Sequence, residues 1–409
     1  MSEPYDHLLE AYARLVVRVG VNVQLGQRVV VRGMVEHAEV ARAVAAEAYR
    51  VGASHVSIEY VDQHLQRAHV DLAPDDSLGT SLRHEVDAIN AWKDDDVAVI
   101  ALTGNPNPTL MDGADPARLA ASLPVERAKA AMQVLGADHV AWSVVAAPNA
   151  GWAESIFGTP DVERLWQSVA LATRLDEDDP VVSWQQHLAK LAHRRDLLNE
   201  RGFDRMHFRG PGTDLVVGLA PRSHWVTAEH TNDAGTAFVA NLPTEEVYTS
   251  PDWRRADGTL STTAPFFLQQ MNVLVDGLVL ELGDGTVRAA KASAGEAAVH
   301  HQLDSVPRAR HLGEVAIVDG DSRVRQTQLT YRDMLYDENA ASHVAWGAGF
   351  PTTIEGGTDL DVQQRIEAGV NQSATHVDVV VGSPDVEVHG IAADGTSTPV
   401  LVGDEFVLG

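Results

Sequence analysis

A strand, helix and strand pattern near the N-terminus constrains the fold more than any other feature of this sequence. Residues 29–31 are three consecutive valines, the β-branched density that is typical of a buried strand. An alanine-rich helical stretch over residues 35–51 follows and is closed by Gly52, and residues 55–61 form the next predicted strand. This order is typical of a parallel sheet whose faces are covered by helices. The chain therefore begins with an α/β arrangement.

The same pattern is repeated further along the chain. Residues 97–102 and 139–145 are predicted strands, and residues 124–135 between them are a predicted helix. Amphipathic spacing predicts additional helices over residues 5–19, 161–171 and 180–199. We therefore expect the first half of the chain to be an α/β domain with a mostly parallel sheet.

The character of the sequence changes near residue 205. Short alternating segments, such as residues 206–208, 215–217 and 277–282, are separated by turns rich in Gly and Asp. With 409 residues, the chain also exceeds the size at which one hydrophobic core usually stops growing. We predict two domains: an α/β N-terminal domain over residues 1–204 and a β-rich α+β C-terminal domain over residues 205–409.

Charge and composition narrow the classes of partner and of chemistry. The chain has 31 Lys and Arg against 58 Asp and Glu, a net charge of −27 that repels nucleic acids and anionic membranes. Residues 104–108, Gly-Asn-Pro-Asn-Pro, have prolines where a phosphate-binding loop needs free N–H groups. There is no cysteine, so a metal ion would be bound by oxygen and nitrogen ligands. No secretory or membrane-spanning pattern is recognisable, and the cytoplasm is the expected location.

The first candidate site residues are carboxylates in the second half. Glu245 and Glu246 follow a proline-stiffened turn, and Glu314 begins a strongly apolar run that resembles a strand. Adjacent residues of a strand face opposite ways, so one of the two neighbouring glutamates would point into a site. A metal ion would remove the cost of burying Glu314. Solvent exposure explains each of these residues equally well or better when it is considered alone.

The other candidates are His343, His376 and Asp378. On a strand, His376 and Asp378 project to the same face, which gives two ligands on a rigid element. A single histidine such as His343 is more often structural than a ligand, so its value depends on the other residues. Together the candidates supply three carboxylates and two imidazoles, enough to hold two divalent ions with one bridging carboxylate. Zinc, cobalt, manganese and magnesium are all compatible with this mixture.

Motifs spread over nearly the whole chain resemble the aminopeptidase T family, the M29 metallopeptidases. They lie at residues 12–15, 20–24, 241–247, 337–343 and 376–384. The resemblance implies a two-domain, commonly dimeric exopeptidase that releases N-terminal amino acids from peptides or small aminoacyl compounds. It also implies that the ligands of two divalent metal ions, with zinc as the first expectation, are Glu246, Glu314, His343, His376 and Asp378. The choice of Glu246 over Glu245 is left open.

One position departs from the family pattern. The family has a tyrosine about seven residues after the metal-binding histidine, whereas this chain has Phe350. A phenylalanine cannot donate a hydrogen bond to the oxyanion of a tetrahedral intermediate, and loss of such a donor costs about 10²- to 10³-fold in turnover. Tyr331 and Tyr336 are the candidates for a replacement donor.

These inferences predict a hydrolase in which water is activated between two metal ions. Glu245 and Glu314 are the predicted catalytic residues, Glu245 acting as a general base or orienting a ligand. The alternatives are a mononuclear Fe(II) ring-cleaving dioxygenase, an amidase of related fold with an altered substrate, and a binding protein that has lost catalysis. Retention of both Glu246 and His343 favours two metal ions over the single iron, which needs only three protein ligands.

Overall fold

The computed structural model describes residues 3–268, 271 and 273–409. The described chain forms two compact units. One consists of the residues up to Trp184 together with Glu229–Leu242, and the other consists of Gln185–Ala228 together with Pro243–Gly409. Within the described ranges, no helix is both long enough and apolar enough to cross a membrane. The division of the chain into two domains, residues 1–204 and 205–409, stays a prediction.

The first unit is built on a five-stranded parallel sheet with the order β2-β1-β3-β4-β9. The valine run of β1 and most of β3 are buried, as expected for strands covered on both faces. The strands are β1 (Arg28–Met34), β2 (His55–Val61), β3 (Val97–Thr103), β4 (Trp142–Ala146) and β9 (Asn241–Leu242). The predicted α/β fold with a parallel sheet is confirmed.

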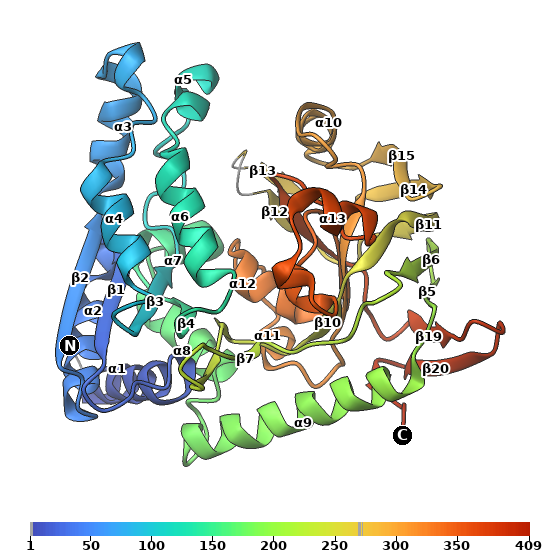
Figure 1. Ribbon diagram of the computed structural model, residues 1–409, viewed down its shortest axis with the longest axis horizontal. Helices are drawn as coiled ribbons and strands as arrows, with labels where there is room; N and C mark the ends of the chain where they lie inside the picture. Colours follow the sequence, from blue (N-terminus) through green and yellow to red (C-terminus); the bar gives the residue numbers. More distant parts are fainter. Residues whose placement is uncertain (1–2, 269–270, 272) are drawn as a thin grey trace. The chain divides into compact units, whose positions relative to one another are not determined.

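Helices accompany this sheet in the sequence and in space (Figure 1). The predicted helix over residues 5–19 is an α-helix that continues into a buried π-helical turn, Val16–Gly20. Helices α3 and α4 were not predicted; each is short and mostly exposed and buries only one residue, Val70 in α3 and Ile89 in α4. The α-helices of this unit are α1 (Glu3–Leu15), α2 (Ala38–Arg50), α3 (Gln63–Leu72), α4 (Arg83–Ala91), α5 (Pro116–Ala121), α6 (Val125–Leu135), α7 (Ala150–Phe157) and α8 (Val162–Ala172).

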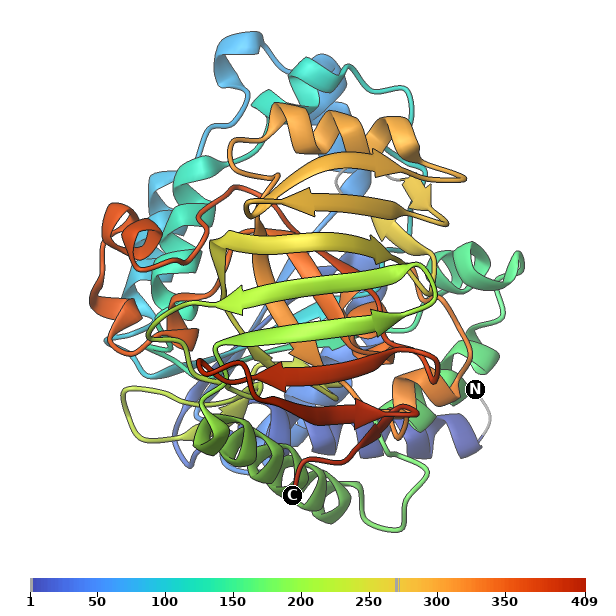
Figure 2. The same cartoon turned by 90° about the vertical axis from the view of Figure 1, so that its right-hand side faces the viewer.

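The second unit contains an eight-stranded antiparallel sheet with the order β15-β14-β11-β6-β5-β19-β20-β21, seen face on in Figure 2. Its strands are β5 (Arg205–Gly210), β6 (Thr213–Leu219), β11 (Pro251–Ser261), β14 (Val279–Gly283), β15 (Thr286–Lys291), β19 (Glu387–Ile391), β20 (Ser397–Val402) and β21 (Glu405–Phe406). The β-rich second half is confirmed.

A smaller antiparallel sheet, β10-β16-β17-β18, belongs to the same unit. It consists of β10 (Val247–Thr249), β16 (Leu312–Ile317), β17 (His343–Gly347) and β18 (His376–Val380). The remaining elements of the second half are α9 (Pro180–Arg201), α10 (Glu296–Ser305), α11 (Arg323–Gln326), α12 (Met334–Asp337), α13 (Val362–Glu367), β12 (Phe266–Leu268) and β13 (Val273–Val275), and the pair β7 (Glu229–Thr231) and β8 (Ala237–Val239) belongs to the first unit.

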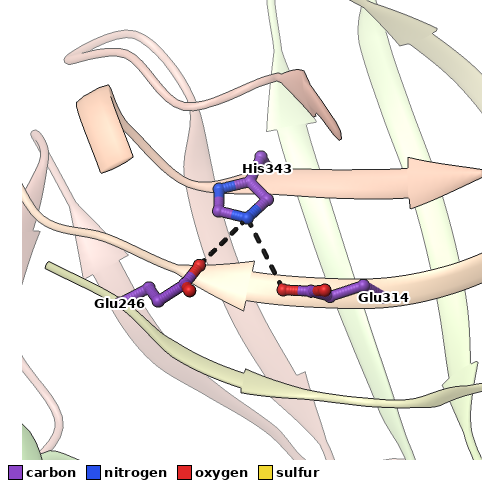
Figure 3. A group of neighbouring side chains, drawn as sticks. All are labelled: Glu246, Glu314 and His343. Carbon is purple, nitrogen blue, oxygen red and sulfur yellow. Dashed lines mark ion pairs between the residues drawn. The ribbon is translucent and has the colours of Figure 1, made fainter. Parts of the chain in front are cut away.

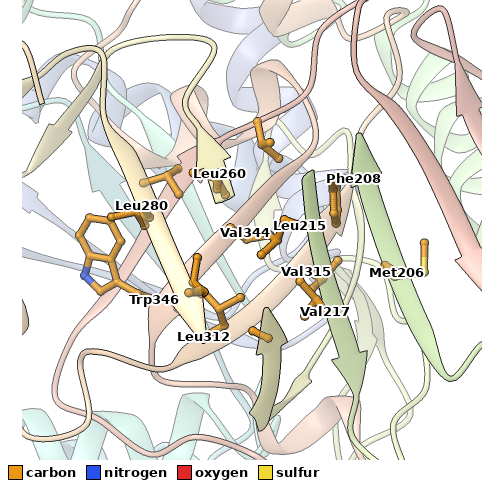
Figure 4. Close-up of a cluster of buried hydrophobic side chains, with 14 of the residues drawn as sticks. Met206, Phe208, Leu215, Val217, Leu260, Leu280, Leu312, Val315, Val344 and Trp346 are labelled. Atoms are coloured by element: carbon orange, nitrogen blue, oxygen red, sulfur yellow. The ribbon is translucent and has the colours of Figure 1, made fainter. Parts of the chain in front are cut away.

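The two sheets of the second unit share one hydrophobic core (Figure 4). The larger sheet contributes side chains such as Phe208 and Leu215, and the smaller sheet contributes Val315, Val344 and Trp346. Successive side chains of a strand alternate between the two faces of a sheet. One face of the smaller sheet packs in the core, so the intervening residues of its strands point to the other face. That second face carries the candidate site residues.

Candidate metal centre

Strand register places the candidate site residues in neighbouring rows on one face of the smaller sheet. Glu314 on β16 pairs with Ala345 on β17, which in turn pairs with Asp378 on β18. In the next row, Ala316 lies between Tyr248 and His343. The residues that lie between the candidate ligands in these rows are Ala345 and Ala316. Their small methyl groups leave space above the strands for an ion.

A β-bulge in β16 is what aims Glu314 at this face. Leu312 pairs with Trp346, whereas Glu314 pairs with Ala345, so two steps along β16 match one step along β17. Without the extra residue, Leu312 and Glu314 would face the same way. With it, Leu312 enters the hydrophobic core while Glu314 points into the site.

The extra residue, Gly313, has no room for a side chain. A Cβ atom on Gly313 would lie 2.1 Å from the carbonyl oxygen of Ala348 and 2.6 Å from that of Gly347. Both contacts are with backbone, which cannot rotate away as a side chain does. Glycine at this position is therefore required by the close approach of two chain segments.

We expect Gly313→Ala to displace Glu314 and to destabilise the fold by about 1–3 kcal/mol, the usual cost of overpacking. Gly283→Ala is a matched control, because its added Cβ would contact the flexible side chain of Arg288, 2.8 Å away at Nε. Thermal unfolding and metal titration of both variants would check this. Unchanged stability and metal affinity in Gly313→Ala would show that the bulge does not determine the position of Glu314.

Glu246, Glu314 and His343 form the first half of the centre (Figure 3). The Nε2 atom of His343 lies 3.1 Å from Oε2 of Glu246 and 3.6 Å from Oε1 of Glu314. All three side chains are at least 95% buried. Glu246 directly precedes β10, Glu314 lies on β16 and His343 begins β17, so their convergence is a product of the fold.

Glu314, His376 and Asp378 form the second half. Nε2 of His376 lies 3.3 Å from Oε2 of Glu314 and 3.3 Å from Oδ1 of Asp378. Glu314 therefore presents one carboxylate oxygen to each histidine. The two halves share this residue, the arrangement that a bridging carboxylate requires.

The other ring nitrogen of each histidine is fixed by a backbone carbonyl. Nδ1 of His343 lies 3.1 Å from the oxygen of Ala341, and Nδ1 of His376 lies 2.7 Å from the oxygen of Ala348. A carbonyl oxygen can only accept, so each Nδ1 carries the donated hydrogen. This orients Nε2 of both rings towards the carboxylates, as histidine ligands of metal ions are normally oriented.

Burial and mutual charge shift the pKa values of this group. Burial raises the pKa of Glu246, and the contact with His343 only partly offsets that effect. Burial alone lowers the pKa of His343, but Glu246 and Glu314 raise it well above its usual range. Burial alone lowers the pKa of His376, but Asp378 and Glu314 together raise it well above its usual value. Cation binding at Nε2 must displace these protons, so metal affinity should fall as the pH is lowered.

The residues fit a divalent metal by their chemistry and by their unsatisfied atoms. Both carboxylate oxygens of Asp378 and Oε2 of Glu246 are buried and have no hydrogen bond of normal geometry within the part of the chain that the structure describes. A buried anionic oxygen without a donor is costly unless a cation compensates for it. Imidazole and carboxylate ligands together suit zinc and related ions.

Glu245, the neighbour of Glu246, has different surroundings. Its Oε1 accepts a hydrogen bond from the backbone N–H of Arg323 at 3.2 Å, and its Oε2 lies 3.4 Å from Nε2 of His187 on α9. Its own N–H donates to Oδ1 of Asn339 at 2.7 Å. These contacts anchor the segment that carries Glu246.

Two residues with a place in this neighbourhood were not assigned a role from the sequence. Asn339 is fully buried and connects the N–H of Glu245 to the carbonyl of Leu335. Burial raises the pKa of Glu338 well above its usual range, and the negative charges of Asp378 and Glu246 raise it further. Both residues belong to the Asp-Glu-Asn-Ala segment of the family motif. Their place in that motif was the one feature of the sequence that could have indicated a role for them.

The tyrosines proposed as replacement donors pack on each other. The rings of Tyr331 and Tyr336 are fully buried with their centroids 4.4 Å apart. Phe350 itself lies at the site, with its ring centroid 5.0 Å from that of His376 and 5.7 Å from that of Tyr248. Tyr248, which the sequence did not suggest, shares the site face with His343 and contacts Phe350, so it is a further candidate for the donor.

Comparison with known proteins places the chain in a family. Residues 5–406 match the family model of thermophilic metalloproteases, M29. The chain is 35% identical to aminopeptidase T of Thermus thermophilus, covering 99% of this chain and all of that protein, and 34% identical to aminopeptidase AmpS of Bacillus subtilis, covering 98% of each. The solved structure of wild-type AmpT from Thermus thermophilus superposes with a TM-score of 0.90 at 34% identity, covering 98% of this chain and all of that one. The chain therefore belongs to the M29 family of thermophilic metalloproteases and is a metalloaminopeptidase, a hydrolase.

Proposed function

We propose that this enzyme releases N-terminal amino acids from peptides with a pair of divalent metal ions, zinc being the first candidate. Glu246, Glu314 and His343 would hold one ion, and Glu314, His376 and Asp378 would hold the other. The observation that supports this most directly is the sharing of Glu314 by the two groups. When bound, such ions polarise the scissile carbonyl and acidify a water molecule.

The paired ions would also explain selection for a free amino terminus. The charges of Glu246, Glu314 and Asp378 would be balanced by the two ions, so the loaded centre would not attract a protonated amine. A free amine would instead bind one ion through the lone pair of its nitrogen. The nitrogen of a blocked amine is a poor donor, so such a substrate should be rejected.

Two further carboxylates have separate proposed roles. The sequence predicted that Glu245 acts either as a general base or as a residue that orients a ligand. Its contacts support the second role, because its carboxylate fixes the segment next to Glu246. Glu338 lies beside the group and outside both candidate ligand sets. Because its raised pKa favours the protonated form, we assign to it the donation of a proton to the leaving amine.

The ring-cleaving oxygenase alternative has no support from the family match, and the amidase alternative differs from the proposal in its substrate. The homodimer and the cytoplasmic location stay predictions from the sequence.

The experiment that tests the proposal combines substrate discrimination with metal analysis. We expect hydrolysis of leucine p-nitroanilide, no hydrolysis of its N-acetyl derivative, and close to two redox-inert ions per chain. Equal cleavage of both compounds would favour a general amidase. One ion per chain would contradict the paired centre, and absence of hydrolysis over a panel of aminoacyl amides with added metal would contradict the peptidase proposal.

A further inference from the structure

The short segment 347–349, at the end of β17, fixes the ring of His376. The carbonyl oxygen of Ala348 accepts the hydrogen bond from Nδ1 of His376 at 2.7 Å. The backbone N–H of Ala348 donates to the carbonyl oxygen of Thr375, the residue before His376, at 2.7 Å. The direction in which His376 presents Nε2 to the centre therefore depends on where this segment lies.

Asn371, between α13 and β18, holds the segment on both sides of Ala348. Its side-chain Nδ2 donates to the carbonyl oxygen of Gly347 at 2.6 Å, and its own carbonyl oxygen accepts from the N–H of Gly349 at 2.8 Å. Asn371 is fully buried, so neither bond competes with solvent. The two bonds enclose the residue whose carbonyl oxygen orients His376.

The side-chain amide of Asn371 can take only one orientation. Its Oδ1 accepts from Nε of Arg308 at 2.8 Å, and its Nδ2 also donates to the carbonyl oxygen of Arg308 at 2.9 Å. A guanidinium only donates and a carbonyl oxygen only accepts, so a reversed amide would face like partners on both sides. The guanidinium of Arg308 lies in turn over the ring of Trp253, 4.4 Å from the ring centroid. The polar atoms of Asn371 are thus committed to holding the segment.

The two histidines of the centre differ in their dependence on this segment. Nδ1 of His343 is bonded to the carbonyl oxygen of Ala341, which precedes β17, whereas the segment 347–349 lies at the other end of that strand. A change at Asn371 therefore acts on the half of the centre that contains His376.

We propose that Asn371 is a positioning residue for His376, because it holds the carbonyl group of Ala348 at the place where that ring needs its acceptor. The inference rests on the proposed function, in which His376 is a ligand of one ion. Partners that orient a ligand histidine typically contribute about 10- to 100-fold to metal affinity. This contribution belongs to the ion bound by His376 and not to the ion bound by His343.

Asn371→Asp tests the proposal with a side chain of the same shape. The carboxylate has no hydrogen to donate to Gly347 and places an oxygen against that carbonyl group. Titration of the metal-free enzyme with Zn²⁺ should show one binding step weakened by about 10- to 100-fold and the other changed by less than about threefold. Asn149→Asp is the matched control and should leave both steps unchanged. Asn149 is a buried residue of the first unit whose Nδ2 donates to the carbonyl oxygens of Gly104 and Ala147 at 2.8 and 3.1 Å.

A double-variant cycle with His376→Ala separates positioning from a general loss of stability. In the His376→Ala background, Asn371→Asp should not weaken the remaining Zn²⁺ step further, because the ring on which it acts is absent. Arg308→Met keeps an apolar stem over Trp253 but removes the donor to Oδ1, and should weaken the same step to a smaller extent. Equal weakening of both steps, or the same loss with and without His376, would overturn the assignment. If Asn371→Asp does not fold, Arg308→Met and its own cycle with His376→Ala still decide it.

A second readout needs no metal ion. In the metal-free protein, the ring proton on Nδ1 of His376 is bonded to Ala348 and should exchange slowly with water, and its NMR signal is identified by its absence from His376→Ala. Asn371→Asp should accelerate this exchange by at least about 10-fold, and an unchanged rate would contradict the positioning role. If the wild type binds fewer than two zinc ions, the paired centre of the proposed function fails, and the exchange rate still decides whether Asn371 positions His376.

Discussion

Glu314→Ala is expected to abolish peptide hydrolysis and to reduce metal binding at both halves of the centre. Glu314 presents Oε1 to His343 and Oε2 to His376, so its removal takes a ligand from each candidate ion. Groups that act as a unit in catalysis typically cost 10³-fold or more in turnover when one is lost. The measurement is kcat/KM on leucine p-nitroanilide together with the metal content per chain.

His376→Ala provides a graded comparison, because His376 belongs to only one of the two groups. It should lose one ion and retain the other, whereas Glu314→Ala weakens both. Glu281→Ala, at an exposed glutamate of β14, is the control for removal of a carboxylate from the same unit. Full activity in either Glu314→Ala or His376→Ala would rule out the paired centre.

Phe350→Tyr is expected to raise turnover by about 10²- to 10³-fold if the enzyme lacks an oxyanion donor. The ring of Phe350 lies 5.0 Å from the ring of His376 and is 37% exposed, so it adjoins the centre without being tightly enclosed. The measurement is kcat at saturating substrate, since a donor that acts only on the tetrahedral intermediate changes kcat rather than the binding of substrate.

Tyr248→Phe tells whether another phenol already supplies this function. Tyr248 lies two residues after Glu246 on β10, and its ring packs edge-on against Phe350. If Tyr248 is the donor, Tyr248→Phe lowers kcat by about 10²-fold, Phe350→Tyr alone has little effect, and the double variant recovers activity. A reduced rate in Phe350→Tyr, with no loss in Tyr248→Phe, would contradict a role for either ring position in stabilising the oxyanion.

Local pattern was sufficient for much of the fold. The valine-rich runs of β1 and β3 and the amphipathic spacing of α9 depend on residues close together in the chain, so the parallel sheet and the long helix could be predicted. Helices α3 and α4 were missed although they are amphipathic, because each is short and mostly exposed and buries a single residue.

The candidate site divides in the same way. That His376 and Asp378 share a face follows from the twofold alternation of a strand, and the motifs indicated the remaining candidates. Which neighbouring glutamate joins the group could not be predicted, because alternation says only that the two point apart. The contacts of Glu245 with Arg323 and His187 separate it from Glu246, and those partners lie far away in the sequence.

The sequence by itself determined the order of elements, the chemistry of the five candidate ligands and the departure at Phe350, since each is a property of local residues. Only the tertiary structure decided that a bulge at Gly313 turns Glu314 into the site and that Tyr248 lies beside Phe350. The reason is physical: strand pairing and packing bring together atoms from segments that have no local relation, and a periodic pattern contains no record of those contacts.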